Sequence, residues 1–283
     1  MTRLTPADLD GLAGALLKFD SELKDKCGCN LRQLACRAIG IPEESLISMA
    51  GKTPVSVIPV TSGEGVIAGF VETIQAIGAH LGFPVRITGS ADVAGLAEAY
   101  AERAAIITLA DDRRYIAVNL KTLFIAENTY HTAKGFVTAL ELMACSLKER
   151  RVLIIGCGSV GSCICRLLLE HGARVALYDV NSGQSLRLAL DIEKGGSGLV
   201  HVEAGQKPDF CRYDLIVDAC PAPDIIDQNC VTERTYIVAP GVPSGVTGAA
   251  QELLAKRYLH DPLLIGTAVM LLSAACSPPI STL

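Results

Sequence analysis

The chain has 283 residues and a formal net charge of −5, and 50% of its residues are hydrophobic. No cluster of lysine and arginine recurs along one face, which argues against nucleic acid as a partner. The polar N-terminus has no apolar signal core, and the most apolar run, residues 266–276, is too short to span a bilayer. We therefore expect a cytoplasmic protein with no membrane partner, long enough for two domains of ordinary size.

The eleven cysteines suit a reducing compartment, where most cysteines act as small buried hydrophobic residues. Cys27, Cys29 and Cys36 are closely spaced, but no histidine or second cysteine pair accompanies them at zinc-site spacing. We predict no metal cofactor, although these three thiols leave a local metal site open.

The first half alternates helices and strands. Residues 5–49 are expected to be helical, and the apolar run at 54–60 is expected to be a strand. The elements expected after it are a helix near 66–81, a strand at 85–88, a helix near 93–103, strands at 105–110 and 115–120, and a helix near 129–146. This alternation predicts an α/β fold.

Two polar loops follow strands of the first half. Ser62 lies in "VTSGEG" (60–65), where a helix N-terminus would seat a substrate carboxylate or be closed by an ordinary cap. Asp111 and Asp112 lie in "LADDRR" (109–114) and are either turn formers or carboxylates for a substrate ammonium.

The second half reads as a Rossmann domain with a parallel sheet. Strands are expected at 152–156, 174–179, 198–203, 213–220 and 235–241. The closing helix, about 262–276, is apolar enough to return and pack against the first half. We therefore expect an N-terminal α/β substrate domain, 1–148 plus about 262–283, and a dinucleotide-binding domain, 149–261.

The run "GCGSVG" has the G-x-G-x-x-G spacing of a dinucleotide-binding turn. Gly156 makes the turn, Gly158 admits a pyrophosphate, and Gly161 lets the helix pack on its strand. The helix, which starts near Ser159 and Val160, directs its free N–H groups at the phosphates. Asp179 ends the second strand, where a carboxylate accepts ribose hydroxyls and favours NAD over NADP. The alternative is a Rossmann-like domain that has lost its ligand.

Two loops and one helix start in the second half carry further candidates. Cys220, Pro221 and Pro240 would flank the cofactor, unless their loops are simple turns. His260 is either a general base or a packed residue, and Asp261 is the expected cap of the closing helix. No Ser-His-Asp or Cys-His set can be argued from spacing, so a hydrolase is not expected.

Segments across nearly the whole chain resemble the pyrrolysine synthase family. They are "SVIPVTSGEGVIAGF" (56–70), "DVAGLAEAY" (92–100), "ITLADDRRYIAVN" (107–119), "TALELMA" (138–144) and "HDPLLIGTAVM" (260–270). The resemblance implies an NAD-dependent oxidoreductase that oxidises the terminal amine of lysine-Nε-3-methyl-D-ornithine. Ammonia is then lost and a pyrroline ring closes.

The same resemblance implies substrate contacts. They fall on Leu4, Ser62, Asp111 and Asp112, with Asp261 as the candidate for an acid near the C-terminus. Leu4 would belong to a mobile first helix that closes over the substrate, or would simply pack. We expect Asp111, Asp112 and His260 as catalytic candidates.

Two other functions remain open on the residues alone. One is another two-domain amino-acid or methylene-tetrahydrofolate-type dehydrogenase, which would need a lysine near the nicotinamide, with Lys121 and Lys134 as candidates. The other is an NAD-sensing regulatory module without chemistry. The apolar excess also allows a homodimer.

Overall fold

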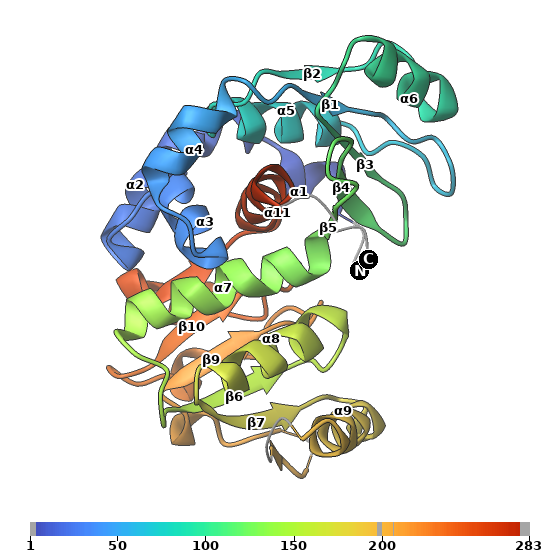
Figure 1. Ribbon diagram of the computed structural model, residues 1–283. Coiled ribbons are helices and arrows are strands. Elements are labelled where there is room, and N and C mark those ends of the chain that lie inside the picture. Colours follow the sequence, from blue (N-terminus) through green and yellow to red (C-terminus); the bar gives the residue numbers. More distant parts are fainter. Residues whose placement is uncertain (1–3, 197–199, 206, 278–283) are drawn as a thin grey trace.

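The computed structural model describes residues 4–196, 200–205 and 207–277 (Figure 1). Two β-sheets lie one in each half of the chain, with helices packed around them. The first half contains β1 (Val55–Val57), β2 (Val85–Ile87), β3 (Ile106–Ala110), β4 (Tyr115–Asn119) and β5 (Ile125–Glu127). Its helices are α1 (Pro6–Leu9), α2 (Leu16–Cys27), α3 (Leu31–Ile39), α4 (Glu43–Ala50), α5 (Phe70–His80), α6 (Asp92–Ala101) and α7 (Asn128–Ala144).

The first sheet is mixed and runs in the order β2-β1-β3-β4-β5. β1 pairs in parallel with β2 and β3, whereas β3-β4 and β4-β5 are antiparallel. Val55 and Val57 in β1 are buried, as expected for a strand covered on both faces. β3 and β4 join through the short turn at Asp111, so this turn lies at the carboxyl end of β3.

The second sheet is six-stranded and entirely parallel. Its strands are β6 (Arg151–Ile155), β7 (Arg174–Tyr178), β8 (His201–Val202), β9 (Leu215–Asp218), β10 (Tyr236–Ala239) and β11 (Tyr258–His260). The order β11-β10-β9-β6-β7-β8 is that of a Rossmann sheet, with its topological switch between β6 and β9. The helices of this half are α8 (Ser159–Glu170), α9 (Ser182–Lys194) and α10 (Gly248–Leu254).

The last described helix, α11 (Leu264–Cys276), returns to the first half. It packs against α7, α3, α5, β4 and β5, and Figure 1 shows it enclosed by elements of the first half. α7 also packs on α8 and β10, so it lies between α11 and the Rossmann sheet. One core cluster consequently runs from Leu9 through Phe136 and Ile154 to Met270.

The expected α/β fold is confirmed, including the parallel Rossmann sheet and the return of the closing helix. Some local details differ from the expectations. β5 and β11 were not expected, because three-residue strands carry too little periodic signal. Helix α5 begins at Phe70 rather than near 66, and α11 begins at Leu264, two residues beyond Pro262. The domain division at residues 148 and 262 stays a proposal.

Candidate active site

The glycine turn joins β6 to α8. Gly156 has φ +93°, and a Cβ there would lie 2.8 Å from the Ala219 carbonyl oxygen, so only glycine fits without strain. A Cβ on Gly161 would overlap the Gly156 carbonyl oxygen, so α8 can approach its strand only with glycine here. Gly158, the N-cap of α8, has open space where a Cβ would lie. The local geometry is that of the G-x-G-x-x-G turn expected from the sequence, with open space at Gly158.

A groove runs along the carboxyl ends of the second sheet beside this turn. Residues expected at the cofactor line it, namely Gly156, Gly158, Ser159, Val160, Asp179, Cys220 and Pro221. Pro240 does not line the groove and lies instead in the cavity described below.

Asp179 follows β7 and faces the glycine turn. Its Oδ2 accepts a hydrogen bond from the Cys157 N–H at 2.8 Å, and its Oδ1 accepts one from the Asn181 N–H at 2.9 Å. Arg174 starts the same strand at the opposite end, where its Nε donates to Glu149 at 2.9 Å. Lys207 lines the groove, with its Nζ 3.9 Å from Asp227.

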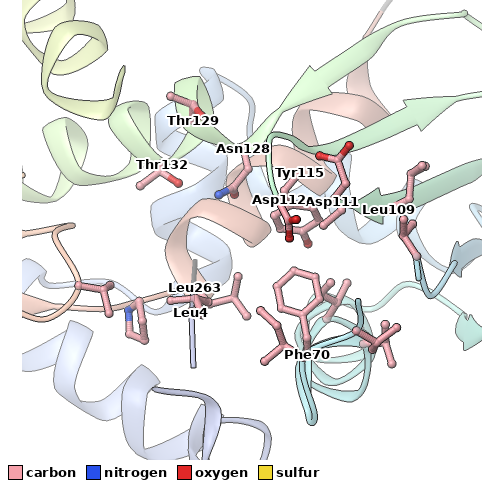
Figure 2. Close-up of a pocket in the computed structure, with 18 of the residues that line it drawn as sticks. Leu4, Phe70, Leu109, Asp111, Asp112, Tyr115, Asn128, Thr129, Thr132 and Leu263 are labelled. Atoms are coloured by element: carbon pink, nitrogen blue, oxygen red, sulfur yellow. The ribbon is translucent and has the colours of Figure 1, made fainter. Parts of the chain in front are cut away.

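A cavity lies next to the groove, between the two halves of the chain (Figure 2). Its empty volume is about 1210 Å³, a value that includes open solvent at its mouth. Most of its wall is apolar, with Val57, Ile58, Ile67, Phe70 and Leu109 on the side of the first sheet. Ala219, Pro240, Gly241 and Val242 close it from the Rossmann side. Val160 and Ala219 line both the cavity and the groove, so the two spaces meet there.

Asp111 and Asp112 line this cavity (Figure 2). All other described residues that line it have uncharged side chains. Asp111 is also a turn former: its Oδ1 accepts from the N–H groups of Arg113 and Arg114 at 2.8 and 2.7 Å. These bonds, first that of Arg114, hold the pKa of Asp111 below its ordinary value. Asp112 Oδ2 accepts the Glu64 N–H at 2.9 Å and so links the loop at 60–65 to this turn. The turn-forming alternative is therefore observed for Asp111, whereas contact of the pair with a substrate ammonium stays a prediction.

Leu4 lines the cavity, just before the capped start of α1 at Thr5. Ser62 is placed differently from expectation. The expected helix N-terminus at this serine is wrong, because α5 begins eight residues later with Gly69 as its N-cap. Ser62 is exposed, closes a turn to the Gly65 N–H, and is not among the residues that line the cavity. Its contact with substrate stays a prediction.

His260 and Asp261 are not among the residues that line the cavity, so their catalytic and substrate-binding roles stay predictions. Asp261 is 3% exposed, and its carboxylate accepts the Leu264 and Ile265 N–H groups at 3.0 and 2.7 Å. Its carboxylate thus satisfies the first N–H groups of α11, although the N-cap residue is Leu263 and not Asp261 as expected. The His260 Nδ1 lies 2.7 Å from the Ala239 carbonyl oxygen and donates to it, which fixes the ring against β10.

Residues at the start of α7 were missed from the sequence. Asn128, Thr129 and Thr132 line the cavity, close to Asp111 and Asp112 (Figure 2). Within the part of the chain that the structure describes, the buried Oδ1 of Asn128 has no hydrogen-bond partner. A polar Asn-Thr-x-x-Thr run at a helix start, directly after a strand, was the available signal.

The remaining cysteine and lysine candidates lie elsewhere. Cys27, Cys29 and Cys36 are buried, and burial raises the pKa of the Cys27 thiol to about 12 and that of Cys36 to about 11. Across residues 4–196, 200–205 and 207–277, no group of three or more metal-ligating side chains is assembled. Neither Lys121 nor Lys134 lines the cavity or the groove.

No helix in the described part of the chain has the length and apolar character to cross a membrane.

Comparisons with known proteins cover almost the whole chain. The family model "Pyrrolysine biosynthesis protein PylD, N-terminal domain" matches residues 8–126. The chain is 32% identical to the pyrrolysine synthase of Methanosarcina acetivorans, over 96% of this chain and 99% of that protein. It is 30% identical to the pyrrolysine synthase of Methanosarcina barkeri, over 96% and 98%. A solved structure of shikimate dehydrogenase from Aquifex aeolicus has a similar fold, with a TM-score of 0.54 and 13% identity over 81% of this chain and 95% of that one.

Proposed function

The chain belongs to the pyrrolysine synthase family, and on that premise we propose that it is an NAD-dependent amine dehydrogenase. Its substrate is lysine-Nε-3-methyl-D-ornithine, which it oxidises at the terminal amine of the ornithine part. Ammonia leaves, and a pyrroline ring closes to give pyrrolysine. One observation carries the proposal: an apolar cavity whose charged lining residues are Asp111 and Asp112 opens beside the glycine-turn groove.

The groove fits a dinucleotide. The open space at Gly158 lies at the N-terminus of the twelve-residue helix α8, whose free N–H groups suit a pyrophosphate. Each oxygen of Asp179 already accepts one backbone N–H, and a carboxylate oxygen has room for a second donor. The ribose hydroxyls of NAD would supply these donors, whereas a 2′-phosphate would be repelled. When bound, the nicotinamide supplies the hydride acceptor.

The cavity suits a cationic amine that must become neutral. Asp111 stays ionised because its Oδ1 accepts two backbone N–H groups, so it can attract an ammonium. The apolar wall around Phe70 and Leu109 favours the neutral amine, because a buried ammonium is poorly solvated. Hydride can leave the amine carbon only after the nitrogen has lost its proton. The Asp111 carboxylate stabilises the ammonium and the apolar wall opposes it, so the wall is the part of the cavity that acts in the direction the reaction needs.

Ring closure needs little from the protein beyond confinement. Loss of one proton and one hydride leaves an imine on the substrate, and water converts it to an aldehyde with release of ammonia. The α-amine of the same ornithine part then attacks the aldehyde, and water leaves as the C=N bond forms. Because both groups belong to one bound molecule, their effective concentration is high and no protein nucleophile is required.

Turnover of the dipeptide tests the proposal. The protein is mixed with NAD and lysine-Nε-3-methyl-D-ornithine, and NADH absorbance and ammonia are followed together. We expect one ammonia for each NADH, and no reaction with the dipeptide acetylated at its terminal amine. NADP is tested in parallel, because the Lys207 ammonium lines the same groove.

Turnover of ordinary amino acids but not of the dipeptide would instead favour another amino-acid dehydrogenase. NAD binding without any turnover would favour the sensing module.

A further inference from the structure

Asp218 is the last residue of β9 and is fully buried, at the edge of the sheet where the groove and the cavity meet. Its Oδ2 accepts the Gly245 N–H at 2.6 Å, and its Oδ1 accepts the Cys220 S–H at 3.0 Å. Its backbone oxygen accepts the Gly241 N–H at 3.0 Å. One residue therefore holds both the loop after β9 and the loop after β10.

These two loops form the wall between the groove and the cavity. The loop after β9 contributes Ala219 to both spaces and Cys220 to the groove. The loop after β10 contributes Pro240 and Gly241 to the cavity. The loops also touch: a Cβ on Gly241 would overlap the Cys220 carbonyl oxygen. A shift of either loop would therefore move the other and change the junction of the two spaces.

The hydrogen bonds that Asp218 accepts stabilise its ionised form, whereas its burial away from water destabilises that form. The Cys220 and Gly245 groups both donate, so two accepting oxygens match them. Burial raises the pKa of Asp218, while these bonds and the nearby His260 act in the opposite direction. Tyr258 also lies near, with its hydroxyl donating to Ser244 Oγ at 2.8 Å. Loss of an acceptor here leaves a buried donor unpaired, which is costly.

We propose that Asp218 is a positioning residue for the nicotinamide half of the cofactor. It acts through the loops 219–222 and 240–245, which it holds at the junction of the groove and the cavity. The adenosine half is served by the glycine turn and by Asp179, whose hydrogen bonds from Cys157 and Asn181 do not involve Asp218. The inference rests on the proposed cofactor and assigns different residues of the groove to its adenosine half and its nicotinamide half.

The test compares NAD with ADP-ribose, which lacks the nicotinamide, by equilibrium titration without substrate. In Asp218→Asn the amide –NH₂ faces a donor, so we expect the Kd of NAD to rise about tenfold and that of ADP-ribose to change less than about twofold. Asp214→Asn is the matched control: Asp214 precedes the same strand at its other end, 3.5 Å from the Arg234 Nε. In Asp214→Asn the Kd of NAD and the Kd of ADP-ribose should both equal those of the wild type.

Equal weakening of both ligands, or an unchanged Kd for NAD, would overturn the assignment. Binding of neither ligand by the wild type would instead remove the proposed cofactor, and this inference with it.

A second pair of variants applies if Asp218→Asn does not fold. Cys220→Ala removes one donor to Asp218, whereas Cys220→Ser keeps a hydroxyl that can donate. We expect Cys220→Ala to weaken NAD about threefold relative to ADP-ribose, and Cys220→Ser to restore most of the loss. Equal behaviour of the two variants would count against a role through Asp218.

Discussion

The substitution Asp179→Asn tests the cofactor assignment most directly. The carboxylate accepts the Cys157 N–H with one oxygen and the Asn181 N–H with the other. An amide keeps one accepting oxygen and replaces the other with –NH₂, which must face one of these two donors. The variant therefore loses one backbone hydrogen bond and one acceptor for a ribose hydroxyl, at almost unchanged side-chain volume.

The magnitude follows from those two losses. A hydrogen bond to a charged group contributes about 1.5–3 kcal/mol, and about 1.4 kcal/mol corresponds to a tenfold change in Kd. Loss of one ribose bond alone predicts a Kd for NAD about 10- to 100-fold higher. Loss of the negative charge also removes the repulsion of a 2′-phosphate, so the preference for NAD over NADP should fall.

Equilibrium titrations of NAD and NADP measure both effects. Asp191→Asn is the control, because Asp191 is exposed on α9 and makes the same change in net charge away from the groove. Thermal unfolding of both variants shows whether the fold is retained. A Kd for NAD within twofold of the wild type, with an unchanged NAD-to-NADP ratio, would refute the ribose assignment.

Four further predictions concern other parts of the molecule. Gly158→Ala should leave urea unfolding within about 0.5 kcal/mol of the wild type yet weaken NAD, because its Cβ meets only open space in the protein. Gly161→Ala should destabilise the fold by about 1–3 kcal/mol, because its Cβ overlaps the Gly156 carbonyl oxygen. An equal loss of unfolding free energy in Gly158→Ala and Gly161→Ala would contradict this interpretation. In steady-state kinetics, Asp112→Asn should raise the KM for the dipeptide about tenfold or more and leave the KM for NAD unchanged. A rise in both KM values would argue against a contact between Asp112 and the substrate ammonium. Burial lowers the pKa of His131 below 6.5, so this histidine takes up a proton at a higher pH in the unfolded chain than in the folded one. The wild type should therefore lose stability as the pH falls below about 6.5. Urea unfolding at about pH 7.5 and 5.5 measures this loss. His131→Gln should lack that part of the acid sensitivity, and an unchanged pH dependence would rule out this histidine as its source.

The glycine turn and the groove beside it were predictable because their signals are local in the sequence. The glycine spacing, the flanking apolar strand and the acid at the end of the next strand all lie within residues 151–179, and each glycine role depends on backbone geometry that the spacing dictates. Asp111 and Asp112 were predictable in kind but not in arrangement, since the bond from Glu64 joins loops 48 residues apart.

The substrate side was less predictable because it is assembled from distant segments. Asn128 and Thr132 reach the cavity only because α7 lies between α11 and the Rossmann sheet, which no short window of sequence reveals. His260 and Asp261 had suitable chemistry, but the hydrogen bonds to Ala239, Leu264 and Ile265 direct them to structural tasks. Asp218 went unnoticed because an apolar strand ending in aspartate carries no sign that two later loops converge on it.

The position of α11 has a consequence for biosynthesis of the protein. Its Leu264, Ile265, Met270 and Leu271 fill space between α3, α5 and α7, yet they leave the ribosome after every other described element. Until then the faces of α3, α5 and α7 that α11 covers in the folded protein lack this apolar partner, and exposed apolar surface of that kind promotes aggregation. The N-terminal half therefore cannot complete its core until the Rossmann segment and α11 have been translated.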